Sequence, residues 1–242
     1  MATETRESTQ TGGYRTALIV GAGTGVSASL ARLFMREGIR VGLAARDPQK
    51  LQGLCRETGA LAFSVDATDE ARVGRLFQEV EREMGGAPDI VVYNASARAR
   101  GSFVDLVPAE VERTLRVSAF GGFLVAQQAA RRMVPAGRGA ILFTGASASV
   151  KGYPQSAPFA MGKFALRGLA QSLARELAPL GIHVAHFVID GVIRNPGRTE
   201  PADRPDSMLD PDAIAESYLQ VLRQARSAWT WELELRPWLE KF

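Results

Sequence analysis

The most specific chemical signal in the chain is a glycine-rich segment that follows a short apolar run, TALIV. The residues at this junction, where a buried strand would turn into an amphipathic helix, are Gly21, Gly23, Thr24, Gly25 and Val26. Glycines permit a tight turn, and they let a pyrophosphate approach the unpaired N–H groups at the N-terminus of the helix. Any sharp strand-to-helix turn favours glycine, but the strand before and the helix after are the context that a dinucleotide site requires. The segment therefore predicts dinucleotide binding rather than a purely structural turn.

The end of the second predicted strand bears on which dinucleotide is bound. Proteins that bind NAD usually place an acid there, which accepts hydrogen bonds from the ribose hydroxyls. This chain has Ala45 at that position, and Arg46 follows it directly. A guanidinium can pair bidentately with a 2′-phosphate, so the segment favours NADP over NAD. Asp47 comes one position late and is expected to cap the helix that begins at Pro48. The alternative is that Arg46 is only a solvated loop charge.

The elements that must position these residues alternate along the chain. Strand candidates cover residues 16–20, 41–44, 61–65, 90–93, 140–144, 183–189 and 229–235, and helix candidates lie at about 25–37, 48–57, 69–84, 110–133, 158–180 and 211–225. Several strands are nearly continuous apolar runs, which is typical of strands covered on both faces. The alternation predicts an α/β fold, a Rossmann-like doubly wound parallel sheet between two helix layers. No linker or repeat divides the chain, so we expect a single domain over residues 14–242 behind a flexible polar tail, residues 1–13.

Composition excludes several classes of protein. The chain has 242 residues, of which 46% are hydrophobic, so it can bury a substantial core. It carries 29 Lys and Arg against 26 Asp and Glu, and the arginines are spread along it, which argues against a nucleic-acid face. No apolar run approaches the roughly 18 residues of a membrane span, so no membrane partner is expected. One cysteine excludes an internal disulfide and favours a cytoplasmic location, and the two histidines lack the companions of a metal site.

Together these features resemble the short-chain dehydrogenase/reductase family over nearly the whole chain. The glycine segment matches the family's motif except that Ser27 stands where its last glycine is expected. Asp66 is in the position of the acid that meets the adenine in that family. Asn94 and Ala95 match the family's motif after the fourth strand. After the sixth strand the resemblance supports only Val192, as a backbone contact to the cofactor.

The resemblance also implies a catalytic set of Asn, Ser, Tyr and Lys, and here this chain departs from the pattern. In the family the Tyr moves a proton to or from the substrate oxygen, and the Lys holds the nicotinamide ribose and lowers the pKa of the Tyr. The Tyr-x-x-x-Lys motif reads Phe159 to Lys163 in this sequence. The Asn position is Ser118, and the Ser position is Ala146 with Ser147 one residue later. Only the Lys is the expected residue, although a small loop shift could let Ser147 supply the hydroxyl.

Three hypotheses follow, because Phe159 cannot donate or accept a proton and a positioned general acid is worth about 10²–10⁴-fold in rate. In the first, the protein reduces a small carbonyl or an activated substrate, such as an iminium or conjugated compound. Its proton would then come from Tyr153, Ser147, Ser118, Lys163 or water. In the second, the protein binds NADP without chemistry, as a sensor, scaffold or partner subunit. The third, a non-redox lyase, runs against the pattern, because such relatives keep the hydroxyl pair and lose the dinucleotide turn.

The resemblance further implies a small-molecule substrate and self-association. In the family the two helices that correspond to residues 110–133 and 158–180 pair across a twofold axis, so a homodimer or homotetramer is expected. The alternative is that their apolar faces belong to the core of one chain. The proline-rich segment 194–210 is expected to be a loop that covers the substrate. Its composition does not identify that substrate.

Overall fold

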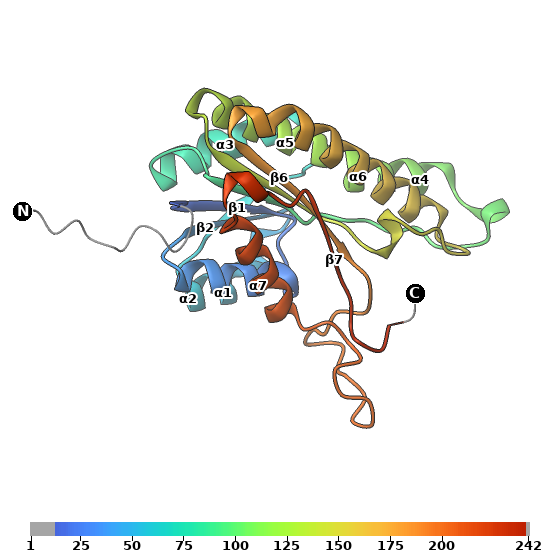
Figure 1. Cartoon of the computed structure of the whole chain (residues 1–242). Helices are drawn as coiled ribbons and strands as arrows, with labels where there is room; N and C mark the ends of the chain where they lie inside the picture. The colour runs from blue at the N-terminus through green and yellow to red at the C-terminus, as the bar shows by residue number, and fades with distance from the viewer. Residues whose placement is uncertain (1–12, 241–242) are drawn as a thin grey trace, which may run out of the picture.

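The computed structural model of the protein describes residues 13–240 and is built on a seven-stranded parallel sheet (Figure 1). The strands are β1 (Thr16–Val20), β2 (Arg40–Ala45), β3 (Leu61–Ser64), β4 (Ile90–Tyr93), β5 (Gly139–Thr144), β6 (Ile182–Ile189) and β7 (Glu232–Leu235). Their order in the sheet is β3-β2-β1-β4-β5-β6-β7. The strands β4, β5 and β6 are buried throughout, which agrees with their nearly continuous apolar sequences.

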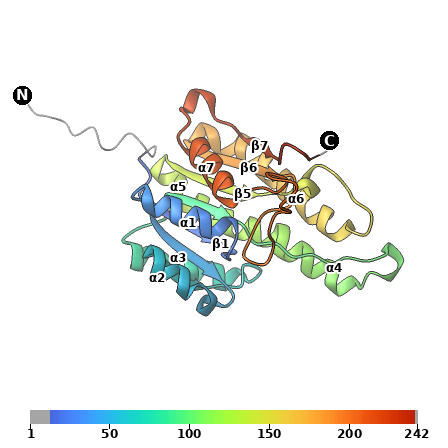
Figure 2. The ribbon, with the colours of Figure 1, turned by 90° about the horizontal axis from the view of Figure 1, so that it is seen from below.

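Helices cover both faces of the sheet and give the molecule three layers (Figure 1). One layer holds α1 (Val26–Arg36), α2 (Gln52–Thr58) and α7 (Pro211–Leu222), with α1 and α7 packed side by side (Figure 2). The other layer holds α3 (Glu70–Met84), α4 (Pro108–Leu115), α5 (Gly121–Ala136) and α6 (Ala157–Leu177). Alternate side chains of the strands feed two separate apolar cores, one under each layer. The predicted Rossmann-like, doubly wound, single-domain fold is confirmed.

The predicted helix over residues 110–133 is interrupted by a π-helical turn, Arg116–Phe120. Its cause is a hydrogen bond from another element, because the Tyr93 hydroxyl donates to the carbonyl oxygen of Val117 at 2.5 Å. The N–H of Gly121 therefore bonds to Arg116 O, one residue earlier than in an α-helix. A Cβ on Gly121 would lie 2.5 Å from the Tyr93 hydroxyl oxygen, so the turn depends on glycine there.

Smaller departures from the predicted elements occur at their ends. The second predicted helix begins as a 3₁₀ turn, Pro48–Leu51, whose first residues are capped by the Asp47 side chain through Gln49 N, as predicted. The predicted helix 158–180 ends in a 3₁₀ turn, Ala178–Leu180. The last predicted strand, 229–235, is shortened to β7. No helix within residues 13–240 has the length and apolar character needed to cross a membrane.

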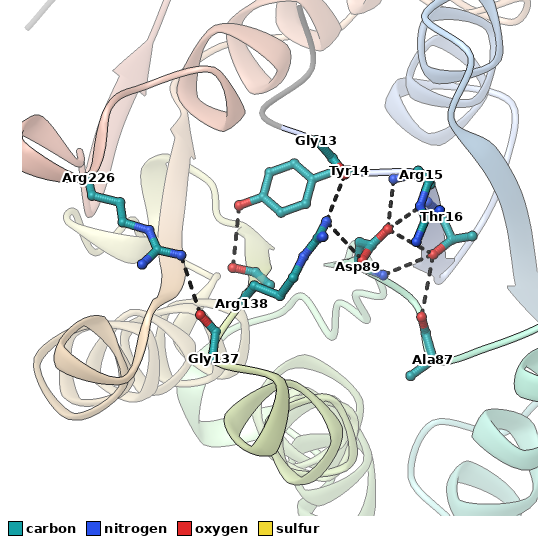
Figure 3. Close-up of polar contacts among 10 residues, drawn as sticks. Gly13, Tyr14, Arg15, Thr16, Ala87, Asp89, Gly137, Arg138 and Arg226 are labelled. Atoms are coloured by element: carbon teal, nitrogen blue, oxygen red, sulfur yellow. Dashed lines mark hydrogen bonds and ion pairs between the residues drawn. The ribbon is translucent and has the colours of Figure 1, made fainter. Parts of the chain in front are cut away.

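The amino-terminal edge of the sheet is held by the carboxylate of Asp89, just before β4 (Figure 3). Its Oδ2 accepts the backbone N–H groups of Arg15 at 2.7 Å and Thr16 at 3.2 Å. Arg138 lies 3.3 Å from Oδ1 and also donates to Gly13 O at 2.7 Å. These contacts fix β1, β4 and β5 at the edge opposite the glycine turn. The predicted tail lies outside the described residues apart from Gly13.

Candidate active site

A cavity of about 930 Å³ opens at the carboxyl ends of β1, β2 and β4. The strand order reverses between β1 and β4, and α/β sheets bind ligands at such a switch point. The predicted cofactor residues that line it are Gly21, Gly23, Thr24, Arg46, Asp66, Asn94 and Ala95. The other four do not line it: Gly25 is the N-cap of α1, Val26 and Lys163 are buried, and Val192 is exposed on the segment after β6.

The glycine turn is built for close approach of backbone to backbone. Gly21 has a φ of +85°, and a Cβ on it would lie 2.3 Å from the nitrogen of Ala95, so no other residue fits. The Asn94 amide donates to Gly21 O at 3.2 Å and to Ser27 Oγ at 2.8 Å. No side chain caps the first turn of α1. Its unpaired N–H groups and the cavity beside them fit the phosphates of a dinucleotide.

Two charged side chains, Arg46 and Asp66, line the cavity just after the ends of β2 and β3. Arg46 is exposed there and forms no ion pair with any residue that the structure describes. Asp66 Oδ1 accepts hydrogen bonds from Thr68 N at 2.9 Å and Thr68 Oγ1 at 2.8 Å. These bonds, and more weakly the charge of Arg46, lower the pKa of Asp66. The wall therefore offers an anion fixed by Thr68 and a cation that forms no ion pair within residues 13–240.

Lys163 projects from α6 into the interior, with only 2% of the residue exposed. Its Nζ donates to the carbonyl oxygen of Thr144 at 2.7 Å, at the end of β5. Burial, reinforced by the positive charge of Arg98, lowers the pKa of Lys163 to about 7. The amine is therefore divided between its charged and neutral forms near neutral pH.

Phe159 lies one turn before Lys163, with its ring centroid 6.0 Å from the lysine Nζ. The ring packs with Ala146 and Ala148 in a small apolar cluster. The guanidinium of Arg98 lies over the ring, 4.1 Å from its centroid. The position beside Lys163 is thus filled by an apolar ring, which cannot transfer a proton.

The structure brings Ser118 to the same face of α6. Its Oγ lies 3.4 Å from both the backbone nitrogen and the carbonyl oxygen of Ala97, and the residue is fully buried in the π-helical turn. A Cβ on Gly162 would lie 2.7 Å from Ser118 Cβ, so the close packing of the two helices depends on this glycine. Ser118 is therefore packed against α6 at Gly162, the residue before Lys163.

The two other predicted catalytic residues lie on the connection that follows β5. Ser147 is half-buried in a 3₁₀ turn, Ser147–Ser149. Tyr153 lies in the loop beyond it with 46% of the residue exposed. This loop is tied to the end of β6 by Lys151, whose Nζ is 2.8 Å from the buried carboxylate of Asp190. Tyr153 is therefore at the surface, whereas Ser147 borders the apolar cluster around Phe159.

The turn that carries Ser147 is held by a buried hydrogen-bond chain that sequence reasoning missed. Ser149 Oγ accepts the N–H of Ala146 at 3.2 Å and lies 3.3 Å from His186 Nε2. His186 Nδ1 is 3.1 Å from Glu232 Oε2, and Arg167 pairs with the same carboxylate at 2.6 Å. Burial lowers the pKa of His186 to about 4, so the ring is neutral at pH 7. Among residues 13–240, no group of three His, Cys, Asp or Glu side chains is placed to hold a metal ion.

Comparison with known proteins places the chain in a family. The family model for short chain dehydrogenases matches residues 15–203. An uncharacterised oxidoreductase of Staphylococcus aureus (strain N315) is 28% identical over 227 residues, which cover 91% of this chain and 96% of that protein. A short-chain dehydrogenase from Rhodopseudomonas palustris has a crystal structure with 33% identity and a TM-score of 0.79, covering 93% of this chain and 99% of that chain. A metagenomic short-chain oxidoreductase in complex with NADP has 26% identity and a TM-score of 0.81, covering 96% and 100%. This chain belongs to the short-chain dehydrogenase family of oxidoreductases.

Proposed function

We propose that the protein binds NADP(H) and transfers a hydride to a small carbonyl compound, or to an activated substrate such as an iminium or conjugated compound, with a non-standard proton donor. The observation that carries this proposal is the cavity at the switch point of the sheet, bordered by the glycine turn and by Arg98. Arg98 in turn lies on Phe159, beside the buried amine of Lys163. The NADP complex of the metagenomic relative supports the choice of cofactor.

The chain's own residues divide the binding of the dinucleotide among them. The backbone around Gly21 and Gly23, with the free N–H groups of α1, would hold the pyrophosphate. Asp66 would meet the adenine, and Arg46 would pair with the 2′-phosphate that distinguishes NADP from NAD. Asn94 holds the turn in place through Gly21 O and Ser27. Lys163 would contact the nicotinamide ribose, and bound NADPH supplies the hydride.

Reduction of a carbonyl group adds a hydride to carbon and a proton to oxygen, and the source of that proton is the open chemical question. Phe159, which aligns with the family's Tyr, supplies none. Lys163 is the best-placed candidate, because its lowered pKa lets the ammonium form release a proton near neutral pH and regain it from water. Ser118 and Ser147 could relay that proton, whereas Tyr153 is largely exposed on its loop.

The second candidate function is an NADP-binding protein without catalysis, acting as a sensor, scaffold or partner subunit. One observation favours it: the Phe159 ring is covered by Ala146 and Ala148 on one side and by Arg98 on the other. The ring itself carries no group that could donate or accept a proton. Both candidate functions require the same cofactor site, and they differ only in turnover.

A titration of the purified protein with NADPH and then NADH, followed by energy transfer from tryptophan, tests the cofactor site. We expect saturable binding with NADPH preferred by about tenfold or more, since a charged pair to the 2′-phosphate contributes about 1.5–3 kcal/mol. Arg46→Ala should weaken NADPH binding and spare NADH binding. Arg56→Ala, which removes an exposed arginine outside the cavity, is the matched control. Equal losses for both nucleotides would reject Arg46 as the phosphate reader, and no binding of either would reject both candidate functions.

A further inference from the structure

Arg98 lies over Phe159 and lines the same cavity as the glycine turn, and the charges of two further arginines act on it. Arg98 and Arg100 belong to the segment that follows β4, and Arg198 belongs to the loop between β6 and α7. Arg98 is exposed as a whole residue, but partial desolvation of its guanidinium lowers its pKa, and the charges of Arg100 and Arg198 lower it further. Two segments far apart in the sequence thus place like charges within electrostatic reach of Arg98, which itself contacts Phe159.

No acidic side chain within residues 13–240 is paired with these three arginines. Two of the four acidic residues of the nearby loop are paired with Arg194, which contacts Asp210 and lies 4.0 Å from Glu200. Like charges held together without a counter-ion favour the binding of an anion, which removes their repulsion.

The position of Arg98 suits an anion that is part of the substrate. Its guanidinium lies over the Phe159 ring at 4.1 Å, and a cation above an aromatic ring is held there by the ring's negative face. Because the flat face of the guanidinium rests on the ring, its N–H groups at the edge are still available as donors. They can donate in parallel to the two oxygens of a carboxylate. Phe159 is also next to Lys163, so an anion on Arg98 would lie near the reacting group.

We propose that Arg98, supported by Arg100 and Arg198, binds a carboxylate of the substrate, so that the substrate is a small carbonyl compound that carries a carboxylate group. The product of its reduction would be the corresponding hydroxy acid. The carbonyl half of this inference rests on the proposed function. The carboxylate half does not, because binding of an anion needs no turnover. The competing explanation is that these arginines grip the phosphates of the cofactor.

Binding of a matched pair of probes tests the inference without catalysis. The probes are 4-fluorobenzoate and 4-fluorobenzamide, which share shape and differ in charge, and ¹⁹F NMR titrations measure their affinity for the NADP-saturated protein. We expect the carboxylate to bind at least tenfold more tightly than the amide. Arg98→Met and, separately, Arg198→Met on the exposed loop should remove or reduce that preference. Arg75→Met on the exposed face of α3 is the control and should keep it. Equal affinity for the two probes, or a preference unchanged in both variants, would overturn the proposal.

Two further arms separate the sources of the anion. If the arginines serve the cofactor, Arg98→Met will weaken NADPH binding and leave the probe preference intact, which would also overturn the proposal.

In the second arm, NADPH oxidation is followed with 4-formylbenzoate, its methyl ester and 4-formylphenyl phosphate. We expect the carboxylate to be favoured over the ester by tenfold or more in kcat/KM, and a preference for the phosphate would overturn the carboxylate assignment. Turnover of none of the three aldehydes would count against the proposed function, and the probe titrations would then decide this inference alone.

Discussion

At the scale of single residues, Phe159 and Lys163 share one face of α6, but only the lysine can exchange a proton. The ring is held between Ala146, Ala148 and Arg98, and the amine is buried against Thr144 O. A hydroxyl added to the Phe159 ring would therefore lie on the same helix face as the Lys163 amine. The proposed function therefore predicts that a phenol at this position would supply a proton donor next to Lys163.

Replacing Phe159 by Tyr tests that conclusion. We expect kcat on a panel of ketones and aldehydes to rise by about 10²-fold or more, because a positioned acid contributes about 10²–10⁴-fold. NADPH affinity should change little, since the ring does not line the cofactor cavity. Phe103→Tyr, at an exposed position outside α6, is the control. Unchanged activity in Phe159→Tyr would show that the phenol is not what the site lacks.

The burial of Lys163 also predicts how stability depends on pH. Its pKa is about 7 in the folded protein, against an ordinary value of 10.5 for a solvated lysine, so between these values the unfolded chain binds more protons. Stability of the cofactor-free protein should therefore rise as pH increases from 7 towards 10. Lys163→Met removes this dependence and should be more stable than the wild type at pH 7, on the order of 3 kcal/mol. Urea unfolding of both proteins at pH 7 and 9.5 measures the difference, and parallel pH profiles would contradict the lowered pKa.

At the scale of elements, the π-helical turn is the feature that places Ser118 against α6. It exists because Val117 O is taken by the Tyr93 hydroxyl, which displaces the bond from Gly121 by one residue. The turn thus links the end of β4 to the helix that faces the proposed substrate. π-helical turns recur at functional sites because they redirect a side chain at a defined point.

Tyr93→Phe removes that hydroxyl and frees Val117 O. We expect a loss of about 1–2 kcal/mol in the free energy of unfolding, because a buried hydrogen bond is lost. The exchange rate of the Gly121 amide with solvent should also change, because Val117 O becomes available to it as an α-helical acceptor. Tyr153→Phe, at an exposed position, should be neutral for stability. Stability and Gly121 exchange equal to those of the wild type would show that the π-helical turn has another cause.

Much of the fold could be predicted from local sequence, and the parts that could not depend on distant contacts. The apolar runs and the glycine turn identified the strands and the cavity, since both are properties of neighbouring residues. The break at Arg116–Phe120 depends on Tyr93, 24 residues away from Val117. The hydrogen bonds that link Ser149, His186 and Glu232 likewise connect three separate elements. The importance of Arg98 appears only when it is placed over Phe159, because a single loop arginine carries no signal of its own.

At the scale of the whole molecule, the outer face of the α5–α6 layer carries large apolar side chains at its surface. Phe120, Phe123, Met161 and Phe164 are each between 41% and 49% exposed, and the rings of Phe120 and Phe123 stack at 6.1 Å. Apolar groups gathered in this way are typical of a surface that another protein covers. Since paired helices at this position are implied by the family resemblance, we expect the partner to be a second copy of the chain.

The double variant Phe123→Glu with Phe164→Glu should therefore be a monomer under conditions in which the wild type is a dimer or tetramer. Charges placed in the centre of an apolar interface lose their hydration without a partner. Light scattering coupled to size-exclusion chromatography measures the mass of each form. Leu61→Glu, at an exposed apolar position on β3, provides the control at the other end of the sheet. A monomeric wild type would refute the expected assembly.

Tyr93, the last residue of β4, and the two residues that follow it contact both parts of the site. Tyr93 holds the π-helical turn, Asn94 holds Gly21 and Ser27, and Ala95 lies against Gly21. These contacts join the glycine turn and the π-helical turn through one short segment at the end of β4. We therefore expect the glycine turn to keep its conformation when a dinucleotide binds, so that little of the binding free energy is spent on ordering it.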